Sequence, residues 1–370
     1  MDFEFSGDQE LLRDSVRRFL ADRAPLAFVR ARLDDDRGTT DEVWRGLCAL
    51  GVTGLLAPED HGGAGMGMVD AAVALEEIGR ALYPGPYASS AIGAVSLVVL
   101  AGSPREHSFL LTGLTSGDTI GTIALLEPAQ RYEWRTPITE ARPAGEQCEL
   151  YGTKVHVPDA ADAGLLLVTA HDHAGMGVYG VDVGDAGVEV QPSASVDGTR
   201  KEGTVVLDGA RGWRMCSGDA TAAVAEVLDR LATAAVVDGV GTAARALELA
   251  VDYAKERVQF DHPIGSFQAV QHLCADMLRA VELARAGAYY ACWAADAGDP
   301  TERHRAATMA KAFASDELYR VGATAVQVFG GIGFTWEHDI HLYLKRLMSL
   351  QRVGGGSDEH LDALARLILD

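Results

Sequence analysis

Long alanine-rich segments with helical periodicity fill the second half of the chain, and they constrain its fold more than any other feature. Residues 219–256 are rich in Ala, Val and Leu in a helical pattern. In residues 266–298 the apolar side chains recur at a spacing close to a heptad seam, at positions 267, 270, 273, 277, 280, 281, 284 and 288. Similar segments follow at 301–329, 336–350 and 357–369. Because alanine-rich faces let helices approach closely, we expect a four-helix bundle.

The first half divides into a helical part and a strand-rich part. Residues 1–118 contain amphipathic segments, one of which, at 40–50, has Thr40 as its expected N-cap. Further on, short runs that are typical of strands recur about 10 residues apart and favour a small antiparallel barrel or sandwich; they lie at 148–157, 163–172, 175–183, 187–196 and 202–210. We therefore predict an α+β multidomain protein, with an N-terminal helical domain (1–118), a middle β domain (119–215) and a C-terminal helical bundle (216–370).

The charge limits the classes of partner. The chain has 32 Lys and Arg against 53 Asp and Glu, so its formal net charge is −21. Nucleic acids and anionic membranes both attract cationic proteins, and neither is expected as the main partner. The longest nearly apolar run, at 91–102, is too short to cross a hydrocarbon core of about 30 Å, so no membrane span is expected.

Cysteine usage bears on the compartment. The five cysteines are far apart, odd in number and form no CxxC motif, at positions 48, 148, 216, 274 and 292. This usage indicates neither a zinc site nor a disulfide framework, and it fits a reducing compartment. The acidic N-terminus, MDFEFSGDQE, is unlike a secretory signal. We expect a cytoplasmic protein without a metal.

Three short motifs suggest ligand sites but have simpler explanations. Gly239–Ala244 satisfies G-x-G-x-x-[GA], but it lies within a helical segment rather than after a strand, so it predicts close helix packing instead of a dinucleotide site. Glu337–His341 has two imidazoles at i, i+3 but no third ligand at a suitable spacing, and is interpreted as a helix start. Gly62–Gly67 lacks the Lys-Ser/Thr of a phosphate-binding loop and is interpreted as a mobile connector.

Two other features indicate an anionic ligand. Arg257 is expected in a short linker between two helices, before an Asp-His-Pro turn and before Ser266, the expected N-cap of the next helix. A guanidinium held at a helix end suits a diphosphate. The glycines around Gly330 would let backbone N–H groups approach an anionic or planar ligand. A turn within a helical bundle would explain either feature alone.

Together these motifs resemble those of the acyl-CoA dehydrogenase family. The stretches that carry the resemblance are RVQFDHPIGSFQAVQHLCADM (257–277), AVQVFGGIGFTWEHDIHLYLKR (325–346), YGTKVHV (151–157) and, more weakly, APEDHGGAGM (57–66) and ALLEP (124–128). The resemblance implies the three-part fold, a tetramer built as a dimer of dimers, FAD as cofactor and oxidation of an acyl-CoA thioester to the trans-2-enoyl product in fatty acid or lipid metabolism. It also makes electron-transfer flavoprotein the candidate electron acceptor.

The resemblance assigns one half of the cofactor site. In this family an Arg and a Phe of the R-x-Q-F segment, together with the Gln-x-x-Gly-Gly segment, reach across a dimer interface to the diphosphate and adenosine of the neighbouring subunit's FAD. The matching residues here are Arg257, Phe260, Gln268, Gln327, Gly330 and Gly331. FAD would therefore be shared across a dimer interface.

The other half of the site departs from the family pattern. Gly354 stands where the catalytic Glu is expected, and Leu231 aligns with the position that carries the Glu in other members. The segment that frames the flavin and the thioester is here 127–133, and the Trp-x-Thr that covers the flavin is His156-Val-Pro158. Because removal of the α-proton needs a positioned base, its loss should cost about 10²–10⁴ in rate.

Three hypotheses follow from this asymmetry. In the first, the chain is one subunit of a heteromer whose homologous partner carries the Glu. In the second, it is self-sufficient and uses Asp238 or another base; Asp238 lies seven residues after Leu231 and so shares its helix face, although an Asp in a bundle is also commonly paired. In the third, the fold binds an acyl thioester without oxidising it. The sequence alone leaves the identity of the acyl group open.

Overall fold

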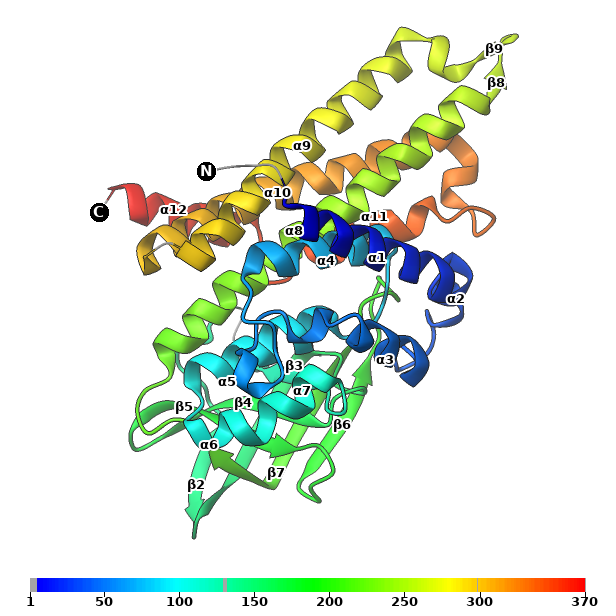
Figure 1. Ribbon diagram of the computed structural model, residues 1–370. Helices are drawn as coiled ribbons and strands as arrows, with labels where there is room; N and C mark the ends of the chain where they lie inside the picture. Colours follow the sequence, from blue (N-terminus) through cyan, green and yellow to red (C-terminus); the bar gives the residue numbers. More distant parts are fainter. Residues whose placement is uncertain (1–4, 129–131, 298, 370) are drawn as a thin grey trace. The chain divides into compact units, whose positions relative to one another are not determined.

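The structure, a computed structural model, describes residues 5–128, 132–297 and 299–369. Helices come first along the chain, strands second and long helices last, as the sequence pattern predicts (Figure 1). The chain divides into two units. We call residues 30–71 and 84–231 the barrel unit, and residues 1–29, 72–83 and 232–370 the bundle unit.

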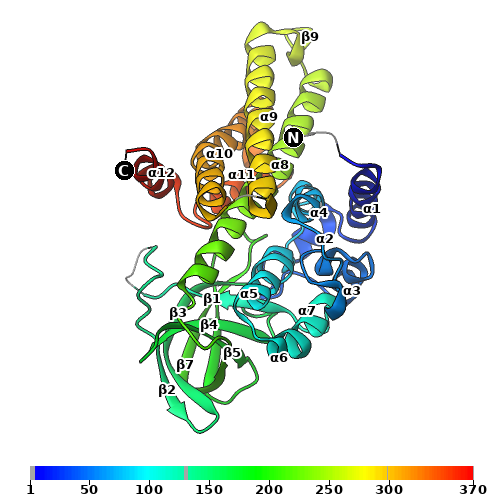
Figure 2. The same cartoon turned by 60° about the vertical axis from the view of Figure 1, so that its left-hand side comes forward.

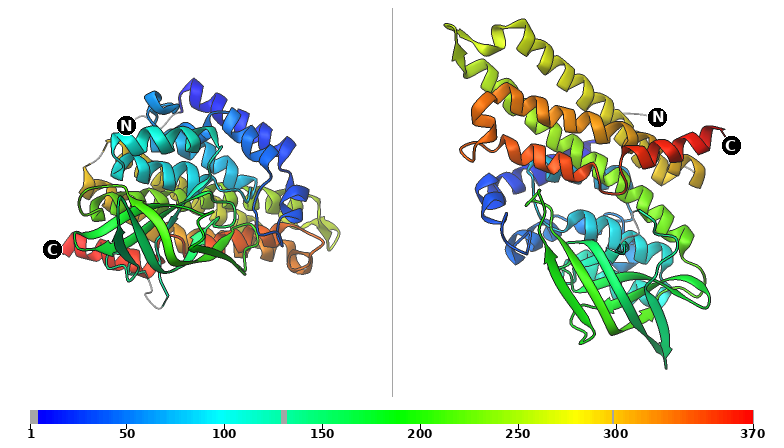
Figure 3. Two further views of the ribbon diagram at one scale, coloured as in Figure 1. Left: turned by 90° about the horizontal axis from the view of Figure 1, so that it is seen from below. Right: turned by 180° about the vertical axis from the view of Figure 1, so that it is seen from behind.

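Seven strands form the sheet of the barrel unit (Figure 3). They are β1 (Gly121–Ala124), β2 (Glu140–Ala144), β3 (Gln147–Pro158), β4 (Leu165–Asp172), β5 (Gly175–Asp182), β6 (Val188–Ser193) and β7 (Glu202–Arg214). The order β4-β2-β3-β7-β5 closes because β5 also pairs with β4, while β1 adds to β4 and β6 to β7. The predicted barrel is therefore confirmed. It is not purely antiparallel, since β1 and β2 both run parallel to β4.

Strand β4 shows why this sheet is stable. Its side chains alternate between two apolar clusters: Leu165 and Leu167 pack with Val95 of helix α5 (Val95–Ala101), whereas Leu166 and Val168 pack with residues of the other strands. A strand that is buried on both faces is apolar throughout, which explains the continuous Leu-Leu-Leu-Val segment.

Short helical segments complete the barrel unit and the N-terminal part of the chain. They are α1 (Gly7–Arg23), α2 (Leu26–Ala31), α3 (Asp41–Ala49), α4 (Met68–Arg80), α5 (Val95–Ala101), α6 (Pro104–Glu106), α7 (Thr112–Ser116) and two π-helical segments, Tyr87–Ala94 and His107–Leu111. Thr40 caps α3 as predicted, because its hydroxyl accepts a hydrogen bond from the Val43 N–H. The connector Gly62–Gly67 is hydrogen-bonded to the preceding segment, because the N–H groups of Ala64 and Met66 donate to the Gly54 and Leu55 carbonyls at 2.9 and 2.8 Å.

Long helices dominate the bundle unit (Figure 2). They are α8 (Thr221–Glu256), which begins in the barrel unit, α9 (Gln268–Ala297), α10 (Pro300–Phe329), α11 (Ile340–Leu350) and α12 (Ser357–Leu369). The hairpin of β8 (Val258–Gln259) and β9 (His262–Pro263) joins α8 to α9. Two details differ from expectation. Ser266 is not the N-cap of α9, because it belongs to a 3₁₀ turn and donates to the Pro263 carbonyl, and α11 begins at Ile340 rather than near Glu337.

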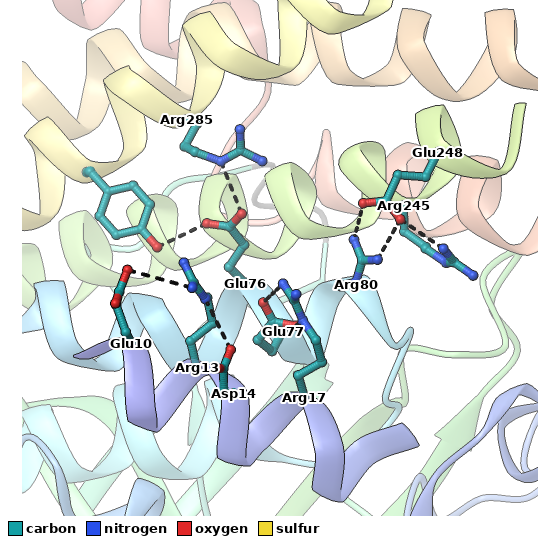
Figure 4. A network of polar contacts seen from close by, with 11 residues as sticks. Glu10, Arg13, Asp14, Arg17, Glu76, Glu77, Arg80, Arg245, Glu248 and Arg285 are labelled. Carbon is teal, nitrogen blue, oxygen red and sulfur yellow. Dashed lines mark hydrogen bonds and ion pairs between the residues drawn. The ribbon is translucent and has the colours of Figure 1, made fainter. Parts of the chain in front are cut away.

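Helix α4 contributes its second half to the bundle unit, where it packs tightly against α8. A β-carbon on Gly241 would lie 1.9 Å from the Glu76 carbonyl oxygen, and one on Gly79 would lie 2.2 Å from that of Asp238. Only glycine permits this approach, so Gly239–Ala244 is a packing motif, as the sequence predicted. Around the contact, ion pairs join α4 to α1, α8 and α9 (Figure 4): Glu77 with Arg17, Arg80 with Glu248, and Glu76 with Arg285.

Candidate active site

The β8–β9 hairpin presents an aromatic ring to solvent. Phe260 and Asp261 form its two-residue turn, with φ of 54° and 65°, and this geometry matches the twist of the flanking strands. The turn therefore lies one residue earlier than the predicted Asp-His-Pro turn. The Phe260 side chain is 85% exposed and meets the ring of Phe267 edge-on at 6.3 Å. An apolar ring held outward in this way suits contact with another molecule.

Arg257 is held by its backbone and leaves its charge available. Its N–H donates to the Tyr253 carbonyl and its own carbonyl accepts from the Ile264 N–H, both at 2.8 Å. The side chain is exposed, and none of the hydrogen bonds or ion pairs among the described residues involves its guanidinium. A fixed backbone with an unpaired guanidinium is a suitable anion-binding arrangement.

A depression of about 610 Å³ lies beside Arg257. It is lined by Tyr253, Arg257, Gln259, Ile264, Val328, Phe329, Gly330, Gly331, Ile332, Thr335 and Glu337. The Tyr253 and Phe329 rings stack at 4.4 Å and form an aromatic part of the wall. A β-carbon on Gly330 or Gly331 would meet no atom within 4 Å, so the backbone here faces open space. The Arg257 cation, the uncovered glycine backbone and the flat aromatic wall together fit a diphosphate that is joined to a planar group.

The structure brings together only some of the residues that the sequence predicted for the FAD-binding half of the site. Arg257, Gly330 and Gly331 line the depression, whereas Phe260, Gln268 and Gln327 are exposed nearby and do not. Sequence reasoning missed the other eight lining residues, among them Tyr253, Phe329, Thr335 and Glu337. Tyr253 could have been found, because it lies one helical turn before Arg257 and so on the same face.

In the barrel unit, Glu127 is a structural carboxylate. It is buried, forms an ion pair with Lys154 Nζ at 2.7 Å, and accepts from the Thr139 N–H at 2.8 Å and the Thr139 hydroxyl at 2.5 Å. Burial acts to raise the pKa of Glu127, but the ammonium and the hydrogen bonds outweigh burial and hold it below its usual value. The carboxylate thus ties the end of β1 to β3. Residues 129–131 of the segment expected to frame the flavin lie outside the described residues.

The end of β3 carries no hydrogen-bond donor at Pro158. His156 has a φ of 52°, and its Nδ1 lies 2.9 Å from a carboxylate oxygen of Glu202. The Pro158 carbonyl accepts from the Thr122 hydroxyl at 2.6 Å. This strand end is therefore well fixed, but proline has neither an N–H nor a hydroxyl with which to contact a ligand at this position.

The segment around Gly354 is crowded where a side chain would begin. Gly354 has a φ of 74°, and a β-carbon on it would lie 3.2 Å from Cα of Ala232 on α8. Its carbonyl lies 2.8 Å from Nε2 of His360. The neighbouring carboxylate, that of Glu359, accepts from the Gly356 N–H at 3.0 Å. Helix α8 therefore crowds the first side-chain atom of any larger residue at position 354.

Substitution of Gly354 tests this packing. Gly354→Ala is expected to lower the free energy of unfolding by about 1–3 kcal/mol, because a β-carbon is strained at positive φ and is crowded by Ala232. Gly331→Ala is the matched control: its new β-carbon meets open space, so a change within about 0.5 kcal/mol is expected. Urea denaturation followed by circular dichroism measures both. Equal effects for the two variants would contradict the packing argument.

Asp238 is buried in the bundle unit and paired. It is 1% exposed; one carboxylate oxygen accepts from the Arg346 guanidinium at 2.9 Å and the other from the Thr242 hydroxyl at 3.2 Å. Arg346 also donates to the Tyr83 carbonyl at 3.0 Å. The sequence analysis considered Asp238 either as a catalytic base or as an Asp paired within the bundle. This placement corresponds to the paired Asp. Leu231, partly buried, packs against the apolar cluster of the barrel unit.

The described residues contain neither a metal-binding cluster nor a membrane-spanning helix. No group of three or more His, Cys, Asp or Glu side chains among them could hold a metal ion. No helix in this part of the chain combines the length and the apolar character that crossing a membrane requires.

Comparison with known proteins identifies close relatives. Residues 6–118 match the model of the acyl-CoA dehydrogenase N-terminal domain, and residues 221–369 match that of the C-terminal domain. The chain is 33% identical to acyl-CoA dehydrogenase IpdE2 of Mycobacterium tuberculosis, over 92% of this chain and 90% of that protein.

Among solved structures, the chain is similar to a variant of the Tcur3481-Tcur3483 steroid ACAD, with a TM-score of 0.89, 30% identity and 98% of each chain covered. It is also similar to a chain of the ChsE4-ChsE5 complex from Mycobacterium tuberculosis, with a TM-score of 0.91, 28% identity, and 100% of this chain and 99% of that chain covered.

Proposed function

This chain belongs to the acyl-CoA dehydrogenase family, and from that premise we propose that it is one subunit of a heteromeric FAD-dependent enzyme. The reaction proposed is α,β-desaturation of an acyl-CoA thioester, with the catalytic base on a homologous partner subunit. One observation carries the proposal: Arg257, Gly330 and Gly331 line a depression that is open to a ligand, whereas Gly354, at the expected position of the base, has no side chain and packs against helix α8.

The residues around Arg257 fit the diphosphate end of FAD. Arg257 would pair with the phosphates, Gly330 and Gly331 would let the backbone approach them, and Phe329 with Tyr253 would lie beside a planar group. Glu337 also lines the depression, and its carboxylate, which has the same charge as the phosphates, would have to stay clear of them. When bound, FAD supplies the hydride acceptor. By resemblance to the family, this FAD belongs mainly to the neighbouring subunit.

Three positions on this chain that could have held a base do not offer one. Gly354 has no side chain and Leu231 is apolar. The Asp238 carboxylate is buried and already accepts hydrogen bonds from the Arg346 guanidinium and the Thr242 hydroxyl. Since α-proton removal requires a positioned acceptor, the partner is the proposed source. Pro158 also distinguishes the two flavin sites, because it can donate no hydrogen bond to a flavin that this chain itself would bind.

The solved relatives support a two-component assembly. One is a chain of a complex of two named proteins, ChsE4 and ChsE5, and another has a name that joins two proteins, Tcur3481 and Tcur3483. A bulky acyl group, such as the steroid in the name of the second relative, is the substrate class that we propose to try first. Electron-transfer flavoprotein is the proposed acceptor.

Co-expression tests the proposal. We would produce the chain alone, and together with a homologous dehydrogenase subunit from the same source that retains the Glu. The expected result is co-purification, a visible flavin band in the complex and bleaching of that band by acyl-CoA. If the chain alone bound one FAD per subunit and acyl-CoA reduced it, the heteromer proposal would fail and the self-sufficient hypothesis would gain. A complex without flavin would instead favour thioester binding without oxidation.

A further inference from the structure

A buried lysine joins two helices of the bundle unit. Lys311 on α10 is 1% exposed. Its Nζ donates to the carbonyls of Leu350 and Gln351 at 2.8 and 3.1 Å, and lies 2.9 Å from the Ser315 hydroxyl oxygen. Leu350 is the last residue of α11, and Gln351 is the first residue of the segment 351–356, which contains Gly354. One amine therefore holds the start of this segment against α10.

The surroundings of this amine are apolar. The cavity beside it has a volume of about 10 Å³, at the lower limit for one water molecule. Apart from Lys311, Ser315 and Gln351, its walls are apolar: Ala235, Val236, Gly239, Ala314, Leu318, Leu347 and Leu350. Burial without a contacting counter-ion disfavours the ammonium relative to the neutral amine.

Charged groups near Lys311 come from three elements, and none of them contacts Nζ. Asp316 on α10 accepts from the Gln351 side chain at 3.4 Å, and Glu359 on α12 accepts from the Gly356 N–H at 3.0 Å. Arg352, after α11, carries the same charge as the ammonium. Burial is the largest influence and lowers the pKa of Lys311 to about 7; Arg352 adds to this effect, and Asp316 and Glu359 oppose it.

The neutral amine satisfies every hydrogen bond at this site. An ammonium has three N–H donors, which match the two carbonyls and the Ser315 oxygen. A neutral amine has two N–H donors and one lone pair. It can keep both carbonyls while the Ser315 hydroxyl rotates and donates to the lone pair. Loss of the proton thus removes the cost of burying a charge without breaking a contact.

The segment that Lys311 holds has other contacts as well, among them the packing of Gly354 against Ala232 and a hydrogen bond from the Gly355 N–H to the Arg352 carbonyl at 3.2 Å. Gly354 and Gly355 are both left-handed, with φ of 74° and 98°. Beyond them, His360 contacts the Gly354 carbonyl and the Ser357 hydroxyl donates to the Ala312 carbonyl at 3.3 Å. If the segment moves away from α10, Nζ loses its acceptors and meets water, where the ammonium is favoured.

We propose that Lys311 is a proton-dependent latch on residues 351–356: the neutral amine holds the segment against α10, and protonation favours its release. The proposal concerns this chain alone and does not depend on the heteromer or on catalysis.

The direction of the pH effect follows from linkage. The pKa of Lys311 is about 7 when the segment is closed, against an ordinary value of 10.5 when the amine is in water. The open form therefore binds more protons between these two values, so closure becomes more favourable as the pH rises. Each pH unit in this range should reduce the open population about tenfold. Below pH 7 both forms are protonated and the extra stability is absent.

Hydrogen–deuterium exchange of the whole chain tests the latch. Protection of the backbone amides in 351–356, corrected for the chemical exchange rate, is measured by pulsed labelling between pH 6 and 9. In the unmodified chain, protection should rise about tenfold per pH unit above pH 7 and stay level below it. Lys311→Met should abolish this slope. Lys345→Met on α11 is the control and should retain it, because Lys345 packs on the Trp336 ring instead.

A second variant tests the latch without removing the amine. Ser315→Ala removes a hydrogen-bond partner from both forms of the amine. Because a hydrogen bond to a charged group is the stronger one, the buried ammonium loses more than the neutral amine, and the rise in protection should begin at a lower pH. The proposal is overturned if the unmodified chain shows no slope, if Lys311→Met keeps the same slope, or if Ser315→Ala leaves the onset unchanged.

Discussion

Replacing Arg346 by methionine is expected to destabilise the bundle unit by about 3–5 kcal/mol. The substitution leaves the Asp238 carboxylate buried with no guanidinium, and it also removes the donor to the Tyr83 carbonyl. A buried charge that has lost its partner is among the costliest defects a core can contain. Urea denaturation at neutral pH, followed by circular dichroism, should show the transition at a clearly lower urea concentration.

Two comparisons isolate the buried pair. Arg320→Met removes an exposed Arg that pairs with Glu317 on the same helix, and should cost less than about 1 kcal/mol. The double variant Arg346→Met with Asp238→Leu removes both charges and should recover much of the loss, because two apolar side chains leave no buried charge. A single variant as stable as the Arg320 control would mean that the ion pair is not a structural element.

The same pair separates the two roles considered for Asp238. If Asp238 were the base, Asp238→Asn would fold normally, bind FAD and fail to reduce it. If it is a structural anion, Asp238→Asn should destabilise the chain, because the Arg346 guanidinium then lacks a counter-charge. A stable Asp238→Asn chain that binds flavin but is not reduced by acyl-CoA would reinstate the catalytic role.

The sequence predicted elements well where local pattern decides them. Long periodic segments gave the bundle helices, and the apolar segment of β4 was recognisable because a strand buried on both faces has no polar alternation. The first residues of the helices were predicted less accurately. Ser266 looks like an N-cap, but the β8–β9 hairpin turns the chain into a 3₁₀ segment first. The start of α11 was placed too early, because Glu337 and Asp339 also occur in the turn that precedes it.

The candidate site was predictable only in part, for a physical reason. Arg257 and Gly330 belong to motifs whose chemistry can be recognised in the sequence itself. The contact of Gly354 with Ala232 joins residues from different helices, and no local pattern encodes it. The Asp238–Arg346 pair likewise depends on how α8 and α11 pack. Long-range packing therefore decided between a base and a structural anion, where helical phase alone could not.

Replacing Arg257 by methionine is expected to weaken FAD binding by the heteromer about 10- to 100-fold, without unfolding the chain. This range corresponds to the loss of one charge-assisted contact to a phosphate, about 1.5–3 kcal/mol. Because the guanidinium is exposed and contacts no carboxylate among the described residues, its removal leaves no buried charge behind. Flavin absorbance of the dialysed complex, titrated with FAD, measures the change.

Matched variants show whether this effect belongs to the site. Lys255→Met removes a nearby exposed cation that pairs with Asp252, and it should leave FAD binding unchanged. Arg257→Lys keeps the charge but loses the planar fork, so intermediate binding is expected. The lost flavin should be the one on the partner that carries the Glu, because Arg257 is proposed to act across the interface. If Arg257→Met retained full FAD affinity, the proposed cross-subunit role of Arg257 would have to be abandoned, even if the two subunits still assembled.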